Sequence, residues 1–200
     1  MDPIVPRWEW RTFGQDFRAA EPRFAALGAE KVQNSEEIYL LASGSDANVK
    51  IRDELMDTKM LERVDSGGLE KWRPVFKDPF PLAASAVAQV QAALGVTPLS
   101  FSAAGLSLHQ LLAELARSDG RVRVVAVRKT RTRHQVQGCV AELTDVVADG
   151  KAVRTVAIED ADPAKVIAAV AVMGLDRFPN ISYPRGLKHL IGMSNRDTHR

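Results

Sequence analysis

Apolar and polar residues alternate along several short segments of the chain, which is the pattern typical of half-buried β-strands. The first such segment covers residues 6–13, where Trp8 and Trp10 share one face and charged residues share the other. Similar segments follow on both sides of a more helical middle region. We therefore predict strands at 6–13, 36–43, 48–55, 57–64, 70–77, 121–136, 138–146 and 152–160.

Helical periodicity and end signals appear between and after these strands. Ser107 with Gln110 forms a capping-box pattern ahead of a leucine stripe, and Asp162 with Pro163 is typical of an N-cap and a first helical residue. The tail after Gly174 has the composition of a loop leading into one short helix. The other predicted helices are 16–27, 83–95, 107–115 and 163–173.

Short, amphipathic strands in this number favour an antiparallel sheet curled into a barrel over a βαβ arrangement. We predict a mainly β (α+β) fold, namely an eight-stranded antiparallel β-barrel that forms a tunnel and has flanking helices. No internal repeat or low-complexity linker divides the chain. The expected organisation is a single domain over 1–200, with the barrel at about 5–160 and a C-terminal helical segment at 161–200.

Composition narrows the class of protein. The 200 residues are 46% apolar, which is enough to bury a core, and the net charge of +2 excludes a generic polybasic arm. Cys139 is the single cysteine, so no intramolecular disulfide forms. The first residues lack a secretory pattern, and the longest apolar run, 166–175, is much shorter than the ~20 residues that span a bilayer. We expect a cytoplasmic protein without a membrane partner.

Cations are concentrated on single faces of separate predicted strands. Lys129, Arg131 and Arg133 occupy every second position of one strand, and Lys50 and Arg52 do the same on another. The simplest interpretation is a set of solvated outer faces, where charged residues normally lie. However, the opposite faces are apolar and the charge is mostly of one sign, which favours a charged lumen with helices packed outside.

A lumen of this kind would gather several cations at short range in a partly desolvated space. We expect the side chains of Lys50, Arg52, Lys59, Lys129 and Arg131 to converge on one internal cavity. Guanidinium groups pair well with phosphate oxygens, so the matching ligand is a polyanionic phosphate compound.

Six short motifs carry a resemblance to a known family. In chain order they are RWEWR, NVKIR, DTKMLER, VRKTRTR, AELTDV and VAIED. This ordered set, over about residues 5–160, resembles the CYTH or triphosphate tunnel metalloenzyme superfamily, which includes class IV adenylyl cyclases, thiamine triphosphatases and inorganic triphosphatases. The tail motif NISYPRGLK is similar to the C-terminal segment of bacterial members associated with polyphosphate metabolism.

The resemblance implies a site in which basic residues hold a triphosphate and carboxylates hold Mg²⁺ or Mn²⁺. The implied catalytic carboxylates are Glu9 and Glu159, and the implied metal ligands are Glu9, Glu142 and Glu159. The implied phosphate-binding residues are Arg11, Lys50, Arg52, Lys59, Lys129, Arg131 and Arg133.

The sequence departs from the family's pattern on the carboxylate side. The family's E-x-E-x-K on the first strand is matched by Arg7, Glu9 and Arg11, so a cation replaces the first glutamate. The E-x-E of the last strand is matched by Ala157 and Glu159. The positions that match the family's phosphate-binding residues are therefore still basic, whereas two positions that match its metal-binding carboxylates are no longer acidic.

These observations leave three functions open. The favoured one is metal-dependent hydrolysis of a triphosphate-containing substrate: tripolyphosphate, polyphosphate, or a nucleoside or thiamine triphosphate. The second is a module of the same fold that binds polyphosphate or a nucleotide without turnover. A nucleic-acid-binding barrel is the remotest, because no aromatic residue is interleaved in the basic strand. We expect a small polyanionic phosphate ligand and no nucleic acid, and the sequence leaves open whether the chain forms a homodimer.

Overall fold

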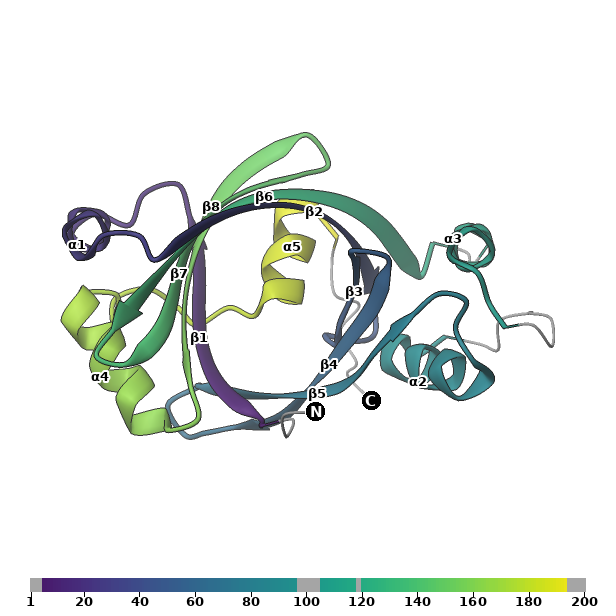
Figure 1. Cartoon of the computed structure of the whole chain (residues 1–200), viewed down its shortest axis with the longest axis horizontal. Coiled ribbons are helices and arrows are strands. Elements are labelled where there is room, and N and C mark those ends of the chain that lie inside the picture. Colours follow the sequence, from purple (N-terminus) through teal and green to yellow (C-terminus); the bar gives the residue numbers. More distant parts are fainter. Residues whose placement is uncertain (1–4, 97–104, 118–119, 194–200) are drawn as a thin grey trace.

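The strands close into a single antiparallel barrel (Figure 1). The structure is a computed structural model that describes residues 5–96, 105–117 and 120–193. Around the barrel the strands follow the order β1-β5-β4-β3-β2-β6-β7-β8. Their bounds are β1 Arg7–Gly14, β2 Lys31–Ala42, β3 Asn48–Arg52, β4 Leu55–Val64, β5 Glu70–Pro79, β6 Val122–Val136, β7 Cys139–Ala148 and β8 Lys151–Asp160. The predicted eight-stranded barrel is confirmed.

Two strand predictions differ from the structure at their ends. The predicted strand 48–55 ends at Arg52, because Asp53 and Glu54 both adopt positive φ and form the two-residue turn of the β3–β4 hairpin. Neither residue is the glycine or asparagine that usually announces such a turn. β2 begins at Lys31 and not at residue 36, and it pairs with β6 along its whole length.

The helices lie against the barrel as predicted, with one boundary change. They are α1 Ala20–Leu27, α2 Ala84–Leu94, α3 Leu108–Ala116, α4 Pro163–Met173 and α5 Tyr183–Ile191. The capping box of Ser107 and Gln110 and the Asp162 cap are both formed. α1 starts four residues later than predicted, after Arg18, whose positive φ is incompatible with a helix.

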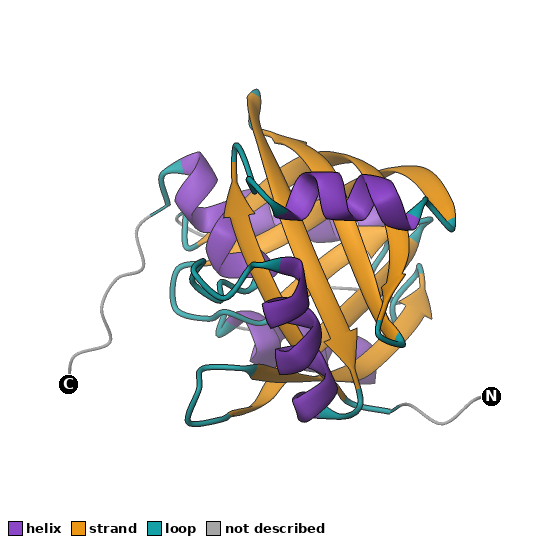
Figure 2. Ribbon diagram, turned by 90° about the vertical axis from the view of Figure 1, so that its left-hand side faces the viewer, coloured by secondary structure: helices purple, strands orange, loops and turns teal. Residues whose placement is uncertain are grey.

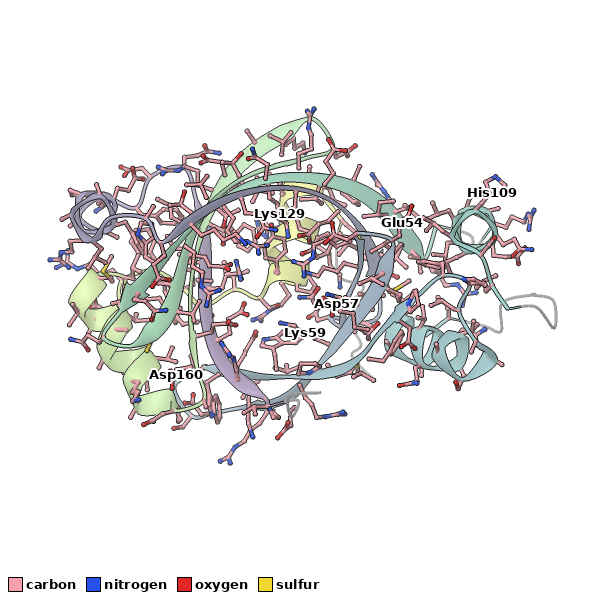
Figure 3. The ribbon with its side chains drawn as sticks, viewed as in Figure 1. Glu54, Asp57, Lys59, His109, Lys129 and Asp160 are labelled. Carbon is pink, nitrogen blue, oxygen red and sulfur yellow. The ribbon has the colours of Figure 1, made fainter. Side chains whose placement is uncertain are left out.

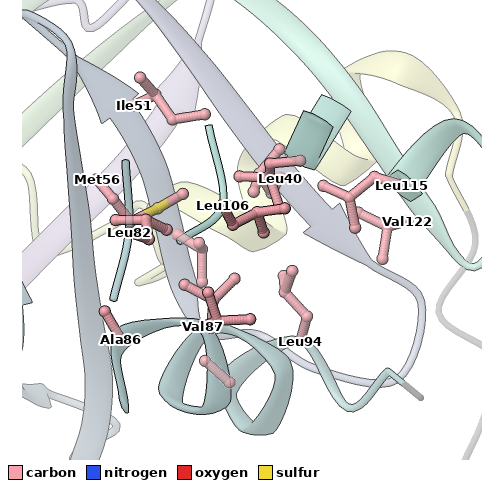
Figure 4. Close-up of a cluster of buried hydrophobic side chains, with 14 of the residues drawn as sticks. Leu40, Ile51, Met56, Leu82, Ala86, Val87, Leu94, Leu106, Leu115 and Val122 are labelled. Atoms are coloured by element: carbon pink, nitrogen blue, oxygen red, sulfur yellow. The ribbon is translucent and has the colours of Figure 1, made fainter. Parts of the chain in front are cut away.

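Helices cover two separate parts of the outer surface of the barrel (Figure 2). α2 packs on β2, β3 and β4, and α3 packs on β6; Leu40, Met56 and Val87 belong to the buried cluster on this side (Figure 4). On the other side α4 packs on β1, β7 and β8, and α1 packs on β6; Trp8 and Trp10 are buried there in a second cluster. The apolar strand faces therefore point outward, as the alternation predicted.

The C-terminal segment enters the barrel through an incomplete seam. β1 pairs with β5 only from Arg7 to Glu9, because Glu70, the partner of Glu9, is the first residue of β5. The backbone N–H of Ile181 donates to the Arg11 carbonyl at 2.6 Å, and the Arg11 N–H donates to Asn180 Oδ1 at 2.8 Å. These bonds satisfy backbone groups of β1 that β5 leaves unpaired.

α5 then occupies one end of the lumen, inside the ring of strands (Figure 1). Tyr183, Leu187 and Ile191 of α5 are buried in a third cluster, together with inward-facing residues such as Val125 and Val127. The alternation of charged and apolar strand faces predicted a charged lumen. The structure shows instead that the inward faces of β2, β6, β7 and β8 are polar at one end of the barrel and apolar at the other.

The described part of the chain contains no helix that is both long and apolar enough to cross a membrane.

Gly186 is where α5 approaches the barrel wall most closely, and this contact is testable. A Cβ atom at this position would lie 2.1 Å from Cε2 of Phe13 on β1. We expect Gly186→Ala to lower the free energy of unfolding by about 1–3 kcal/mol, although alanine is the better helix former. Urea denaturation measures the change. Gly44→Ala is the matched control, because no atom lies within 4 Å of its Cβ position, and a stabilised Gly186→Ala would contradict the packing of α5.

Candidate anion-binding site

One cavity of about 200 Å³ occupies the polar part of the lumen. Figure 3 shows Asp57, Lys59 and Lys129 inside the ring of strands, whereas His109 lies on α3, away from the barrel. The basic side chains that line this pocket are Arg11, Lys50, Arg52, Lys59, Lys129 and Arg131. The predicted convergence of the five cations from β3, β4 and β6 is confirmed.

The carboxylate of Glu37 lies within ion-pair distance of four of these cations. Its side chain is 0% exposed, and its Oε2 lies 2.8 Å from Lys129 Nζ and 3.4 Å from Lys50 Nζ. Its Oε1 lies 3.6 Å from a guanidinium nitrogen of Arg131 and 3.8 Å from one of Arg52. Burial opposes ionisation of Glu37, but attraction to Lys129 and Lys50 outweighs it and lowers its pKa to about 2.

Two stacked tyrosines form the inner end of the pocket. The rings of Tyr39 and Tyr183 lie 5.2 Å apart at an interplanar angle of 14°. Lys129 Nζ donates to the Tyr39 hydroxyl at 2.7 Å and lies 4.1 Å from the Tyr183 ring centroid. Burial lowers the pKa of Lys129 well below its usual value, and Glu37 opposes this shift. The aromatic faces and the carboxylate therefore stabilise a cation that water does not solvate.

Arg11 and Glu9 form a second buried pair at the pocket wall. Arg11 Nε donates to Glu9 Oε1 at 2.7 Å, and the guanidinium lies 4.7 Å from the Tyr183 ring centroid. Burial opposes ionisation of Glu9, but attraction to Arg11 and Lys59 outweighs it and lowers the pKa of this carboxyl. Glu9 is thus a carboxylate already neutralised by a fixed cation.

The three predicted metal ligands face the same space. Glu9 and Glu159 are direct partners across β1 and β8, and Glu142 of β7 lies opposite Ala157 of β8. Burial, followed by repulsion from Glu9, raises the pKa of Glu159, and Glu142 adds to this repulsion. Glu9 and Glu142 are therefore close enough to disfavour the charged form of Glu159.

An arginine nevertheless engages each of these carboxylates. Arg7 donates to Glu159 at 3.1 Å, and Arg131 Nε lies 3.4 Å from Glu142, in addition to the Arg11–Glu9 pair. Among the described residues, no group of three or more His, Cys, Asp or Glu side chains is placed to hold a metal ion. The donor set does not fit a preformed Mg²⁺ or Mn²⁺ site.

Arg133 is the predicted phosphate ligand that the structure does not place in the pocket. Its side chain is 45% exposed, and its Nε lies 3.9 Å from Glu30 Oε2. It shares the inward parity of Lys129 and Arg131 but lies further along β6, beyond the residues that line the cavity.

Sequence reasoning missed Glu37, Tyr39, Asp57 and Tyr183. Glu37 and Tyr39 share the inward face of a predicted strand. Neither residue is basic, so the pattern of cations that predicted an anion site did not include them. Asp57 lies on β4 beside Lys50, at 3.8 Å. Tyr183 lies in the tail motif NISYPRGLK, but nothing in that motif indicates that α5 enters the lumen.

Comparisons with known proteins establish the fold. No protein-family model matches the chain, and no curated protein matches its sequence. The solved structure of HpAC1 from Hippeastrum, a "putative adenylyl cyclase" described as having a dominant triphosphatase activity, is similar at 12% identity and a TM-score of 0.52, covering 92% of this chain and 95% of that one. A conserved hypothetical protein from Pyrococcus furiosus is similar at 14% identity and a TM-score of 0.51, covering 89% and 98%.

This chain has the CYTH fold. At such low identity the likeness concerns the fold alone, and it agrees with the ordered motifs that predicted a CYTH barrel. The chain spans nearly the whole length of both structures. The particular residues of this pocket must therefore carry any statement about its chemistry.

Glu159 gives a pH-dependent test of the carboxylate cluster. Because its pKa is raised in the folded state, its contribution to stability is complete below the unfolded pKa and is lost as pH rises through the folded pKa. We expect Glu159→Gln to raise the melting temperature at pH 7 by roughly 1–3 °C, with the gain vanishing near pH 4. Differential scanning calorimetry across this range measures the shift.

Glu9→Gln is the matched contrast for this measurement. The pKa of Glu9 is lowered, so its charge stabilises the fold above the unfolded pKa, and this stabilisation is lost as pH falls. The Glu9→Gln variant should melt below the wild type at pH 7 and approach it in acid. Shifts of the same sign in both variants would contradict the assigned environments.

Proposed function

We propose that the pocket binds the phosphate chain of a small triphosphate-containing molecule, such as tripolyphosphate, the end of a polyphosphate, or a nucleoside or thiamine triphosphate. The observation that carries this proposal is the convergence of six basic side chains from β1, β3, β4 and β6 on one cavity inside the barrel. A chain with an overall charge of only +2 has no general reason to gather them there.

The charge balance of the pocket favours an anion. Six basic side chains and four carboxylates, Glu9, Asp57, Glu142 and Glu159, line the cavity. Their interactions with a bound anion are strengthened because the surrounding wall is protein and not water. Arg52 and Arg131 are partly exposed within this cavity, and their planar donors suit adjacent phosphate oxygens.

The inner end of the pocket determines how a ligand would lie. Tyr39 and Tyr183 close off the apolar part of the lumen, which α5 and its neighbours fill. A phosphate chain would therefore enter with one end first, and any nucleoside or longer chain attached to it would stay near the entrance.

Metal-dependent hydrolysis is the second candidate function. Repulsion of the Glu159 carboxylate by Glu9 and Glu142 favours it, because a cation between these groups would relieve that repulsion. The triphosphatase activity described for HpAC1 on the same fold also supports it. Since arginines engage the carboxylates, a divalent ion would have to arrive already bound to the phosphate chain, as Mg²⁺ commonly does.

Tripolyphosphate without metal tests the binding proposal. At low salt and a concentration about a hundredfold above its Kd, it should raise the melting temperature by roughly 5 °C, and added salt should reduce the gain. Arg131→Ala should weaken binding about tenfold, because it removes a charge-assisted contact. Arg128→Ala is the control: this residue lies on the same strand but is exposed on the outer face. Equal effects of the two variants would exclude the pocket as the binding site.

Phosphate release tests the second candidate. Wild-type protein is incubated with tripolyphosphate, long polyphosphate, ATP and thiamine triphosphate, each with Mg²⁺ and with Mn²⁺. We expect the variant with Arg7→Glu and Ala157→Glu, which restores the two missing carboxylates, to release phosphate at least roughly tenfold faster than the wild type. A folded double variant that binds tripolyphosphate but releases no phosphate would show that these carboxylates are not what limits turnover.

A further inference from the structure

Glu37 is buried at the place where the proposed ligand needs positive charge. Its two oxygens lie within 4 Å of Lys50, Arg52, Lys129 and Arg131, with distances from 2.8 to 3.8 Å. It does not line the pocket, and its side chain is 0% exposed. Glu37 thus lies behind the layer of cations that faces the cavity.

Phosphate binding by itself gives no reason for a carboxylate at this position. A negative charge behind the cations repels an incoming anion through a medium that screens poorly. In the empty pocket the same charge is needed, because four like charges held in a desolvated wall repel one another. Glu37 therefore stabilises the folded protein while the pocket is empty, and it weakens the binding of an anionic ligand.

The ammonium group of Lys129 interacts mainly with Glu37 and with the two tyrosines. An ammonium group has three N–H donors. Lys129 directs them to Glu37 at 2.8 Å and Tyr39 at 2.7 Å, and the Tyr183 ring centroid lies 4.1 Å away. The side chain is only 2% exposed, which leaves little of the ammonium for a phosphate oxygen.

We propose that Glu37 is a built-in counter-anion that substitutes for the phosphate ligand in the empty pocket and thereby sets the affinity of the site. Lys129 is its positioning partner and does not contact the phosphate. This inference rests on the proposed function. It adds that the bound anion takes over from Glu37 its share in neutralising Lys50, Arg52 and Arg131, which also lie near Asp57, Asp53 and Glu142, respectively.

The decisive variant is Glu37→Gln, which keeps the shape of the side chain and removes its charge. Tripolyphosphate affinity is measured by isothermal titration calorimetry without metal at low salt, and melting temperatures are measured with and without the ligand. Glu37→Gln should bind tripolyphosphate about tenfold more tightly or better. Without ligand it should melt below the wild type, and saturating tripolyphosphate should remove most of that difference.

Two matched variants separate this effect from simpler ones. Asp145→Asn removes one negative charge from the outer face of β7, where Asp145 pairs with Arg154 and its side chain is 66% exposed. It should leave tripolyphosphate affinity within about twofold of the wild type, because solvent screens it. Glu37→Asp keeps the charge and should stay within about threefold of the wild type.

The outcomes distinguish this inference from the proposed function. If the wild type and all variants fail to bind tripolyphosphate, both are overturned. If the wild type binds but Glu37→Gln binds equally or more weakly, the proposed function stands and the counter-anion role is wrong. A gain in Glu37→Asp equal to that in Glu37→Gln would also overturn the role, because repulsion by the charge would not be its cause.

A crystal structure of wild-type protein with tripolyphosphate keeps the inference testable if Glu37→Gln does not fold. We expect the Glu37–Lys129 ion pair to persist while phosphate oxygens contact Arg52 or Arg131. A phosphate oxygen bonded to Lys129 Nζ, with the Glu37 carboxylate displaced, would contradict the proposal.

Discussion

Repulsion among like charges inside the barrel is the constraint on which the rest of the structure depends. Six basic side chains share one cavity, and each loses water when the barrel closes. Glu37 offsets this repulsion for four of them, and the tyrosine rings offset it further for Lys129. Of the other carboxylates, Glu9, Glu142 and Glu159 pair with Arg11, Arg131 and Arg7, and Asp57 lies near Lys50. The cavity is thus a network of ion pairs with an excess of positive charge.

A polar lumen also dictates what lies outside the barrel. When the charged residues of a strand point inward, the alternating apolar residues point outward and need cover. α2 and α3 supply that cover on one side, and α1 with α4 supplies it over Trp8 and Trp10 on the other. At the end where the inward residues are apolar, α5 supplies the cover from inside. The helices therefore pack against the apolar faces of the strands, both outside the barrel and inside it.

The sequence predicted the barrel and the cations because both depend on a local period of two. Lys129 and Arg131 must share a face of any strand, and their apolar neighbours indicate which face is covered. The same argument could not identify Glu37, whose role depends on contacts with β3 and β6, the two strands that pair with β2 in the folded barrel. It also could not place Tyr183, because an amphipathic helix does not reveal which surface it packs against. Arg133 has the inward parity of a pocket residue, but it lies too far along β6 to line the cavity. Parity alone therefore predicts one phosphate ligand too many.

Arg7 and Arg11 place fixed positive charge beside two carboxylates that line the pocket. In a pocket that relies on a divalent ion, the carboxylates attract the ion and the ion attracts the phosphate. Here Arg11 and Arg7 neutralise Glu9 and Glu159 directly, so the positive charge is part of the chain itself. A covalently fixed cation needs no second binding event, and it still allows the anion to bind. It does not supply the metal-bound water that would attack a phosphate. Hydrolysis in this pocket would therefore need an ion that arrives with the phosphate chain, whereas binding of the anion would need only groups of the protein itself.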